Sequence, residues 1–121
     1  ALTACTTLIQ GSGIDGVIAT NSTVSRQYVS GMPRAAEAGG LSGAPLRHLS
    51  LHVVRQLRQR LGPKFPIIGV GGVHNAQTAT EMRVAGADLV QVYTALVYAG
   101  PRIVTDLRRA LAPPKSVVAS F

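Results

Sequence analysis

Three short apolar runs recur along this sequence, and each is followed later in the chain by a segment whose apolar residues have helical spacing. The runs are DGVIAT at residues 15–20, PIIGVGG at residues 66–72 and DLVQVYTAL at residues 88–96. Runs without polar alternation are typical of strands covered on both faces, as in a parallel sheet. We therefore predict strands at these positions, with a short helical turn as the alternative near the end of the third run.

The segments around the strands have the periodicity and the end signals of helices. Gly13, Gly62 and Gly86 follow the first three of these segments and are good helix stops. Asn75 is the predicted N-cap of the third helix, and Pro101 suits the first turn of the last one. The residues expected to face the core are, in chain order, Leu2, Cys5, Leu8, Ile9, Leu49, Val53, Leu57, Leu61, Ala76, Ala79, Met82, Ala85, Ile103, Val104, Leu107 and Leu111.

This alternation of helices and strands indicates right-handed βαβ units around a parallel sheet. Two α/β architectures share it, the doubly wound sheet and the (β/α)8 barrel, and in both the ligands bind at the carboxyl ends of the strands. Residues 20–22, 71–72 and 93–94 should therefore lie on one rim. The connection from Asn21 to about Pro45 is too long for a tight loop, so we predict that it is functional or partly disordered.

The stretch IIGVGGV contains three glycines, which weaken a strand unless something compensates. Exposed N–H groups without a Cβ, just ahead of a helix that begins at Asn75, favour binding of an anion such as phosphate. In barrels, phosphate sites recur in the loops after the last two strands. The alternative is that the glycines only allow a strand to pack tightly against a helix.

The composition excludes several kinds of protein. No apolar run reaches the roughly 18 to 20 residues that span a bilayer, and the first residues lack the charged region of a signal peptide. The single Cys5 cannot form an intrachain disulfide, and no Cys and His cluster has metal-site spacing. Twelve Lys and Arg against five Asp and Glu would suit a nucleic-acid surface, but the arginines mostly alternate with apolar residues of helix-like segments. We interpret them as solvated helix faces and expect no metal and no nucleic-acid partner.

Four segments, in this order and spacing, carry a resemblance to a known family. They are IATNSTVSR (18–26), GGLSGAPLR (39–47), PIIGVGGV (66–73) and GADLVQVYTALVYAGP (86–101). Together they resemble the C-terminal part of dihydroorotate dehydrogenase, over roughly residues 13 to 110. The stretch TNSTVSR, together with Tyr93 and Thr94, resembles the class 2, quinone-dependent enzymes more than the class 1 enzymes.

The resemblance implies a (β/α)8 barrel of which this chain supplies about three βα units. It also implies oxidation of dihydroorotate to orotate, a step of pyrimidine biosynthesis, with FMN as cofactor and a quinone as electron acceptor whose site lies outside this chain. Asn21 and Ser22 match positions that bind the substrate. The positions that match FMN contacts or line the same pocket are Thr20, Ser42, Gly43, Leu46, Val70, Gly71, Gly72, Tyr93 and Thr94. By residue type alone, Asn21 and Ser22 also suit a turn, and Tyr93 also suits a packed strand.

The resemblance has gaps. Ser22 stands where the family usually has threonine, and it keeps the hydroxyl. The family's serine base, its flavin-contacting lysine and its N-terminal helical region, which meets the membrane and the quinone, have no counterpart in these 121 residues. We therefore expect no catalytic base here, and we interpret residues 1–112 as a part of the barrel and 113–121 as a loose tail. The resemblance places the complete enzyme peripherally on a bacterial cell membrane or the mitochondrial inner membrane.

Two other interpretations remain open from the sequence. One is a class 1 dihydroorotate dehydrogenase or another FMN barrel. The other, suggested by the formal charge of +7, is a small free-standing module that binds phosphate or nucleic acid.

Overall fold

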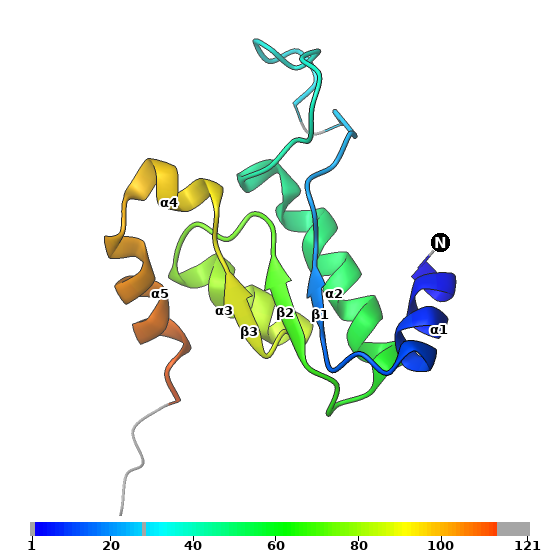
Figure 1. Cartoon of the computed structure of the whole chain (residues 1–121). Helices are drawn as coiled ribbons and strands as arrows, with labels where there is room; N and C mark the ends of the chain where they lie inside the picture. The colour runs from blue at the N-terminus through cyan, green and yellow to red at the C-terminus, as the bar shows by residue number, and fades with distance from the viewer. Residues whose placement is uncertain (1, 28, 114–121) are drawn as a thin grey trace, which may run out of the picture.

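Three parallel strands form one sheet in the order β1-β2-β3 (Figure 1). The computed structural model describes residues 2–27 and 29–113. The strands are β1 Val17–Ala19, β2 Ile67–Val70 and β3 Leu89–Gln91. All three are shorter than predicted, because the residues that flank them turn away into loops. The third run differs most, since a helix begins at Thr94. The predicted strand is confirmed at residues 89–91 and wrong from Thr94 onward, where the helical-turn alternative is confirmed.

The helices connect and flank these strands in the predicted alternation. Their bounds are α1 Leu2–Ser12, the 3-10 turn η1 Ala44–Leu46, α2 Arg47–Leu61, α3 Ala76–Ala85, α4 Thr94–Ala99 and α5 Arg102–Leu111. Asn75 caps α3 as predicted, and its side chain accepts a hydrogen bond from the Thr78 N–H at 2.9 Å. Gly62 and Gly86 end α2 and α3, also as predicted.

The helices cover one face of the sheet. Ala19 and Ile67 point to this face and join a buried cluster with Val54 of α2, Met82 of α3 and Leu107 of α5. On the opposite face the register places the side chains of residues 18, 68 and 89 in one row, and two of them are largely exposed, at 60% and 62%. A doubly wound sheet would carry helices on both faces. The one-sided arrangement confirms the prediction of a barrel wall.

The predicted helix faces are only partly right. The expected core residues that are exposed instead are Cys5, Leu8, Leu49, Ala76 and Val104. Thr6, Ser50, Leu51, Val54 and Thr78 are buried without having been predicted. A helix turns by about 100° per residue, so two rows of side chains (stripes) offset by one residue face directions about 100° apart. Where apolar residues occupy more than one stripe, the position of the sheet decides which stripe is buried.

Arg58 of α2 ties together the loops at the amino ends of the strands. Its guanidinium donates to the carbonyl oxygens of Gly62 at 2.7 Å, Phe65 at 2.8 Å and Gly86 at 2.6 Å. It also pairs with the carboxylate of Asp88 at 2.7 Å. Two loops, the one before β2 and the one before β3, therefore depend on one side chain at the end of the sheet that lies away from the long loop.

The acidic partner of this cluster should make stability depend on pH. The Ile67 N–H, which donates to the Asp88 carboxylate at 2.9 Å, and the Arg58 guanidinium hold the pKa of Asp88 below its usual value of 3.8. A carboxyl group with a lowered pKa in the folded state stabilises the fold above its usual pKa, and this contribution disappears as pH falls through the lowered value. We expect Asp88→Asn to lower the urea midpoint at pH 7 and to have little effect near pH 2. An equal loss at both pH values would contradict the prediction.

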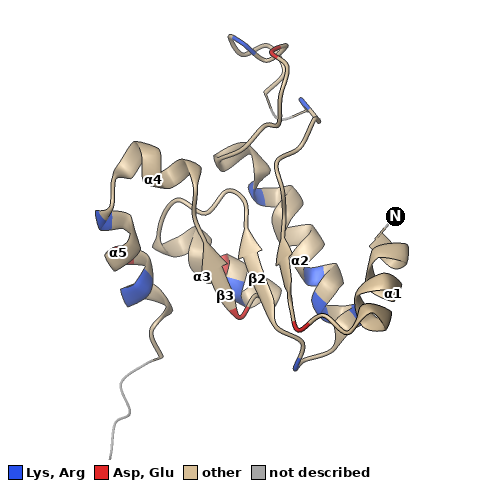
Figure 2. Cartoon of the chain, viewed as in Figure 1, with Lys and Arg blue, Asp and Glu red and all other residues tan. Residues whose placement is uncertain are grey.

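Basic residues are spread over α2, α5 and the loops (Figure 2). Several of them make internal contacts, as Arg58 does, so they do not all form a solvated surface. The absence of a nucleic-acid partner stays a prediction. No helix in the part of the chain that the structure describes is both long and apolar enough to cross a membrane. Of the predicted loose tail, residues 114–121 lie outside the described residues.

Candidate functional site

A cavity of about 1080 Å³ opens at the carboxyl ends of the three strands. The long loop and α4 lie at this end of the sheet (Figure 1). All the residues predicted to bind substrate or cofactor line the cavity: Thr20, Asn21, Ser22, Ser42, Gly43, Leu46, Val70, Gly71, Gly72, Tyr93 and Thr94. The structure thus brings together residues from four separate segments, while their individual roles stay predictions.

The first wall of the cavity comes from the end of β1 and the return of the long loop. The Thr20 N–H donates to the Val70 carbonyl at 2.7 Å, which extends the β1–β2 pairing by one residue. Thr23 and Leu41 form an isolated antiparallel bridge. This bridge brings the two ends of the long loop together. Asn21 at its start and Ser42 near its end therefore both lie at the edge of the cavity.

Arg26 holds the long loop from within. Its guanidinium donates to the carbonyl oxygens of Ala35 at 2.9 Å, Glu37 at 3.0 Å and Gly39 at 2.6 Å. These bonds give the described part of the segment a defined path, and residues at both of its ends line the cavity. A role of this loop in binding stays a prediction.

Serine and threonine hydroxyls join the loop to α4. Ser42 Oγ and Thr94 Oγ1 lie 2.8 Å apart. Gly43 has a φ of +82°, and a Cβ on it would lie 3.0 Å from Thr94 Cγ2. Asn21 Oδ1 accepts a hydrogen bond from the Ser22 N–H at 2.8 Å, and this bond does not use the Asn21 amide nitrogen. Turn chemistry and ligand binding are therefore compatible at Asn21.

The glycines in β2 and directly after it approach protein atoms closely. A Cβ on Gly69 would overlap the Met82 side chain, and one on Gly72 would lie 2.5 Å from the Arg47 Cα. Gly71 and Gly72 also have positive φ angles, of +122° and +76°. The packing role that the sequence left as an alternative is therefore real. Close packing is compatible with anion binding at the same glycines, because none of the described loop or turn hydrogen bonds uses the N–H of Gly71, Gly72 or Val73.

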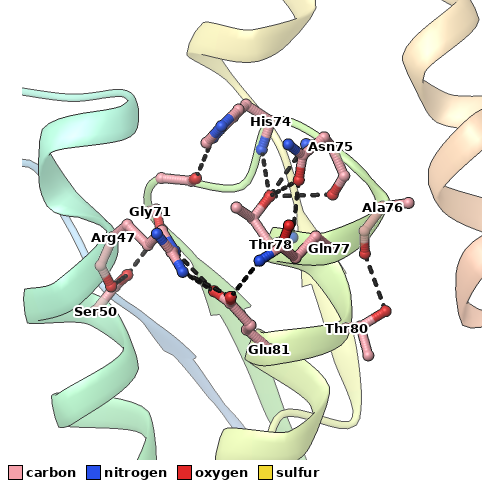
Figure 3. A network of polar contacts seen from close by, with 11 residues as sticks. Arg47, Ser50, Gly71, His74, Asn75, Ala76, Gln77, Thr78, Thr80 and Glu81 are labelled. Atoms are coloured by element: carbon pink, nitrogen blue, oxygen red, sulfur yellow. Dashed lines mark hydrogen bonds and ion pairs between the residues drawn. The ribbon is translucent and has the colours of Figure 1, made fainter.

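The next amides along this loop are already used. The Thr78 hydroxyl accepts from the N–H groups of His74 and Asn75, both at 3.0 Å, in the network of Figure 3. Donors for an anion at this loop must therefore come from residues 71–73. These residues include Gly71 and Gly72, the glycines just ahead of α3 for which the sequence predicts an anion site, and that role stays a prediction.

Sequence reasoning missed some of the residues that line the cavity. His74 was not among the predicted site residues, but it lines the cavity, and its Nδ1 lies 2.8 Å from the Gly72 carbonyl oxygen. Gln91 also lines the cavity and is in register with Val70. Strand alternation relative to Val70 would have identified Gln91, because registered partners in a parallel pair point to the same face.

The donor set and the apolar lining of the cavity are compatible with FMN. The amides of residues 71–73 suit a phosphate, whereas Ile18, Leu46 and Val70 supply apolar surface for a flat ring system. The hydroxyls of Thr20, Ser42 and Thr94 add polar contacts at defined points. The cavity volume of about 1080 Å³ lies slightly above the roughly 300 to 1,000 Å³ range of ligand pockets.

Comparison with known proteins connects this geometry with one family. The family pattern of dihydroorotate dehydrogenase matches residues 2–113. A quinone-type dihydroorotate dehydrogenase of Paracidovorax citrulli is 56% identical over 103 residues, covering 85% of this chain and 29% of that protein. That of Bordetella avium is 60% identical over 95 residues, covering 78% of this chain and 27% of that protein.

A solved structure agrees with these sequence matches. The dihydroorotate dehydrogenase of Eimeria tenella, in complex with ferulenol, superposes with a TM-score of 0.84 at 31% identity, covering 91% of this chain and 29% of that one. The chain thus spans about 30% of the length of the relatives it matches. These matches agree with the parallel strands, with the helices on one face of the sheet and with the cavity at the strand ends. The chain belongs to the dihydroorotate dehydrogenase family.

Proposed function

We propose that these residues form the C-terminal βα units of a quinone-dependent dihydroorotate dehydrogenase, which oxidises dihydroorotate to orotate with FMN. The observation that carries the proposal is the single cavity at the strand ends, lined by every residue that matches a family contact. The exposed row of apolar side chains on the inner face of the sheet supports it, because a barrel interior would cover this row.

In this proposal the two sides of the rim have different roles. The N–H groups of Gly72, Tyr93 and Thr94 hold the phosphate of FMN, and Thr20, Ser42 and Gly43 contact the rest of the cofactor. When bound, FMN supplies the acceptor for the hydride that leaves dihydroorotate. Asn21 and Ser22 orient the substrate, since an amide and a hydroxyl match the donors and acceptors of a pyrimidine carboxylate.

The remaining groups of the reaction belong to other parts of the proposed enzyme. The base that takes the proton from dihydroorotate and the site of the quinone lie outside residues 2–113 in this proposal. Membrane association, at a bacterial cell membrane or the mitochondrial inner membrane, would likewise come from elsewhere in the complete protein. The described residues therefore bind and orient, and they do not transfer the proton.

The test uses a complete barrel. A chimera in which residues 2–113 replace the matching segment of the Paracidovorax citrulli relative supplies the other strands. It should retain FMN and oxidise dihydroorotate with a quinone acceptor. A folded chimera without FMN would overturn the proposal.

Asn21→Ala in this chimera should leave FMN bound and reduce kcat/KM for dihydroorotate about 10- to 100-fold, the effect of losing one hydrogen bond to a charged group. Asn21→Asp is the matched control for turn chemistry, because it keeps the acceptor for the Ser22 N–H but loses the amide donor. If Asn21 contacts the substrate, both variants are impaired. Normal turnover of Asn21→Asp would mean that the residue only shapes the turn.

A further inference from the structure

A two-point ion pair beside the cavity joins Arg47, the first residue of α2, to Glu81 of α3 (Figure 3). Arg47 Nε donates to Glu81 Oε2 at 2.7 Å, and Arg47 Nη2 donates to Oε1 at 2.6 Å. Gln77 Nε2 adds a longer bond to Oε1, at 3.3 Å. The two ionic side chains are 31% and 27% exposed. Such a two-point contact fixes orientation as well as distance.

Arg47 adjoins the glycine loop, yet its guanidinium is paired with a carboxylate. Leu46 lines the cavity, whereas Arg47 does not do so in the part of the chain that the structure describes. Its guanidinium turns to Glu81 instead, and this hydrogen bond holds the pKa of Glu81 below its usual value. The charge of Arg47 is thus matched by a carboxylate at neutral pH.

The backbone of Arg47 meets the glycine loop itself. A Cβ on Gly72 would lie 2.5 Å from the Arg47 Cα and 2.6 Å from its nitrogen, so the two backbones are in close contact. One turn later, Ser50 Oγ donates to the Gly71 carbonyl at 2.6 Å. The first turn of α2 therefore supports the start of the loop, and the Arg47 side chain holds the helix that follows the end of the loop.

We infer that Arg47 and Glu81 are positioning residues: their ion pair fixes the first turn of α2 against α3, so that the amides of residues 71–73 point into the cavity toward the phosphate of FMN. The inference rests on the proposed function and deepens it. It distinguishes two roles for Arg47, because an arginine that bound the phosphate directly would need its charge free, whereas a positioning arginine needs its carboxylate partner.

The experiment measures FMN affinity of the apo chimera by quenching of flavin fluorescence. Glu81→Gln and Arg47→Met should each raise the Kd for FMN about tenfold, in line with the loss of supporting contacts around a site. The double variant should be no weaker than either single variant, because both remove the same pair. If Arg47 were a direct ligand, Glu81→Gln would leave the affinity unchanged or improve it, and that result would overturn the inference.

A charge swap and an exchange measurement separate positioning from general loss of structure. Arg47→Glu combined with Glu81→Arg should recover most of the affinity, although it places a carboxylate at position 47. In the apo chimera, hydrogen exchange at the amides of residues 71–73 should quicken about tenfold in Glu81→Gln, because the loop loses its support. Unchanged exchange together with unchanged affinity would refute the positioning role.

Asp88→Asn provides the structural control, since it breaks an ion pair at the opposite end of the sheet. It should lower the unfolding midpoint but leave the Kd for FMN unchanged. The unmutated chimera separates the two proposals. If it fails to bind FMN, the proposed function is wrong; if it binds FMN and Glu81→Gln binds equally well, only the positioning role is wrong.

Discussion

Gly72→Ala should weaken FMN retention by the chimera about tenfold or more, whereas Gly100→Ala should change it little. The two glycines have nearly the same φ angle, +76° and +75°, in the region that favours glycine. An alanine at either position therefore has a conformational penalty, on the order of 1 kcal/mol or more. The surroundings differ, since a Cβ on Gly72 would overlap the Arg47 backbone and one on Gly100 has nothing within 4 Å.

The extra loss at Gly72 has a physical source that side-chain rearrangement cannot relieve. Backbone atoms of α2 must move, and overpacking of this kind typically destabilises by about 1 to 3 kcal/mol. The movement displaces the amides of residues 71–73 at the same time. The measurements are the flavin content after gel filtration and the urea midpoint of each variant. If the two substitutions changed the flavin content and the urea midpoint equally, the close approach of Gly72 to Arg47 would have no energetic consequence.

Arg58→Met should lower the free energy of unfolding of the chimera by about 3 kcal/mol, which is typical of breaking a largely buried charged cluster. The methionine keeps much of the apolar stem. The carbonyl oxygens of Gly62, Phe65 and Gly86 lose their donor, and Asp88 loses its cation. Arg58 is 19% exposed in its side chain, so water replaces these bonds only in part.

Arg55→Met is the matched control, because Arg55 is an exposed arginine on the same helix. It should change the free energy of unfolding by no more than about 0.5 kcal/mol. Folded Arg58→Met should still bind FMN normally, since the cluster lies at the amino ends of the strands and the cavity at their carboxyl ends. Urea unfolding checks the first expectation, and flavin titration checks the second. If both variants lost a similar free energy of unfolding, Arg58 would contribute only through its positive charge and not through its specific contacts.

Local signals in the sequence were sufficient for the order of elements and for several of their ends. Asn75 and Gly86 bound α3 as predicted because a cap depends on residues within one turn of it. The rim could also be predicted, since the carboxyl ends of parallel strands lie at one edge whatever their partners are. Residues as far apart as Asn21 and Thr94 were therefore assigned to one place without coordinates.

The choice between neighbouring helix stripes was beyond the sequence. Leu49 and Val53 have the same helical spacing as residues that reach the core, yet Leu51 and Val54 are the ones buried. Apolar residues lie on several sides of α2, and the stripe that faces the sheet depends on the angle at which the helix docks. That angle follows from the packing of all the elements together.

By itself the sequence determined that this chain forms parallel βα units with a ligand rim, because apolar runs, caps and glycine stops act over a few residues. Tertiary structure alone decided what the long-range partners are. Arg47 reaches Glu81 across 34 positions, and Arg58 reaches Asp88 across 30. In sequence these arginines look like members of a solvated helix face. Which carboxylate or carbonyl each one meets depends on how α2 is placed against α3, and no pattern within a single element specifies that placement.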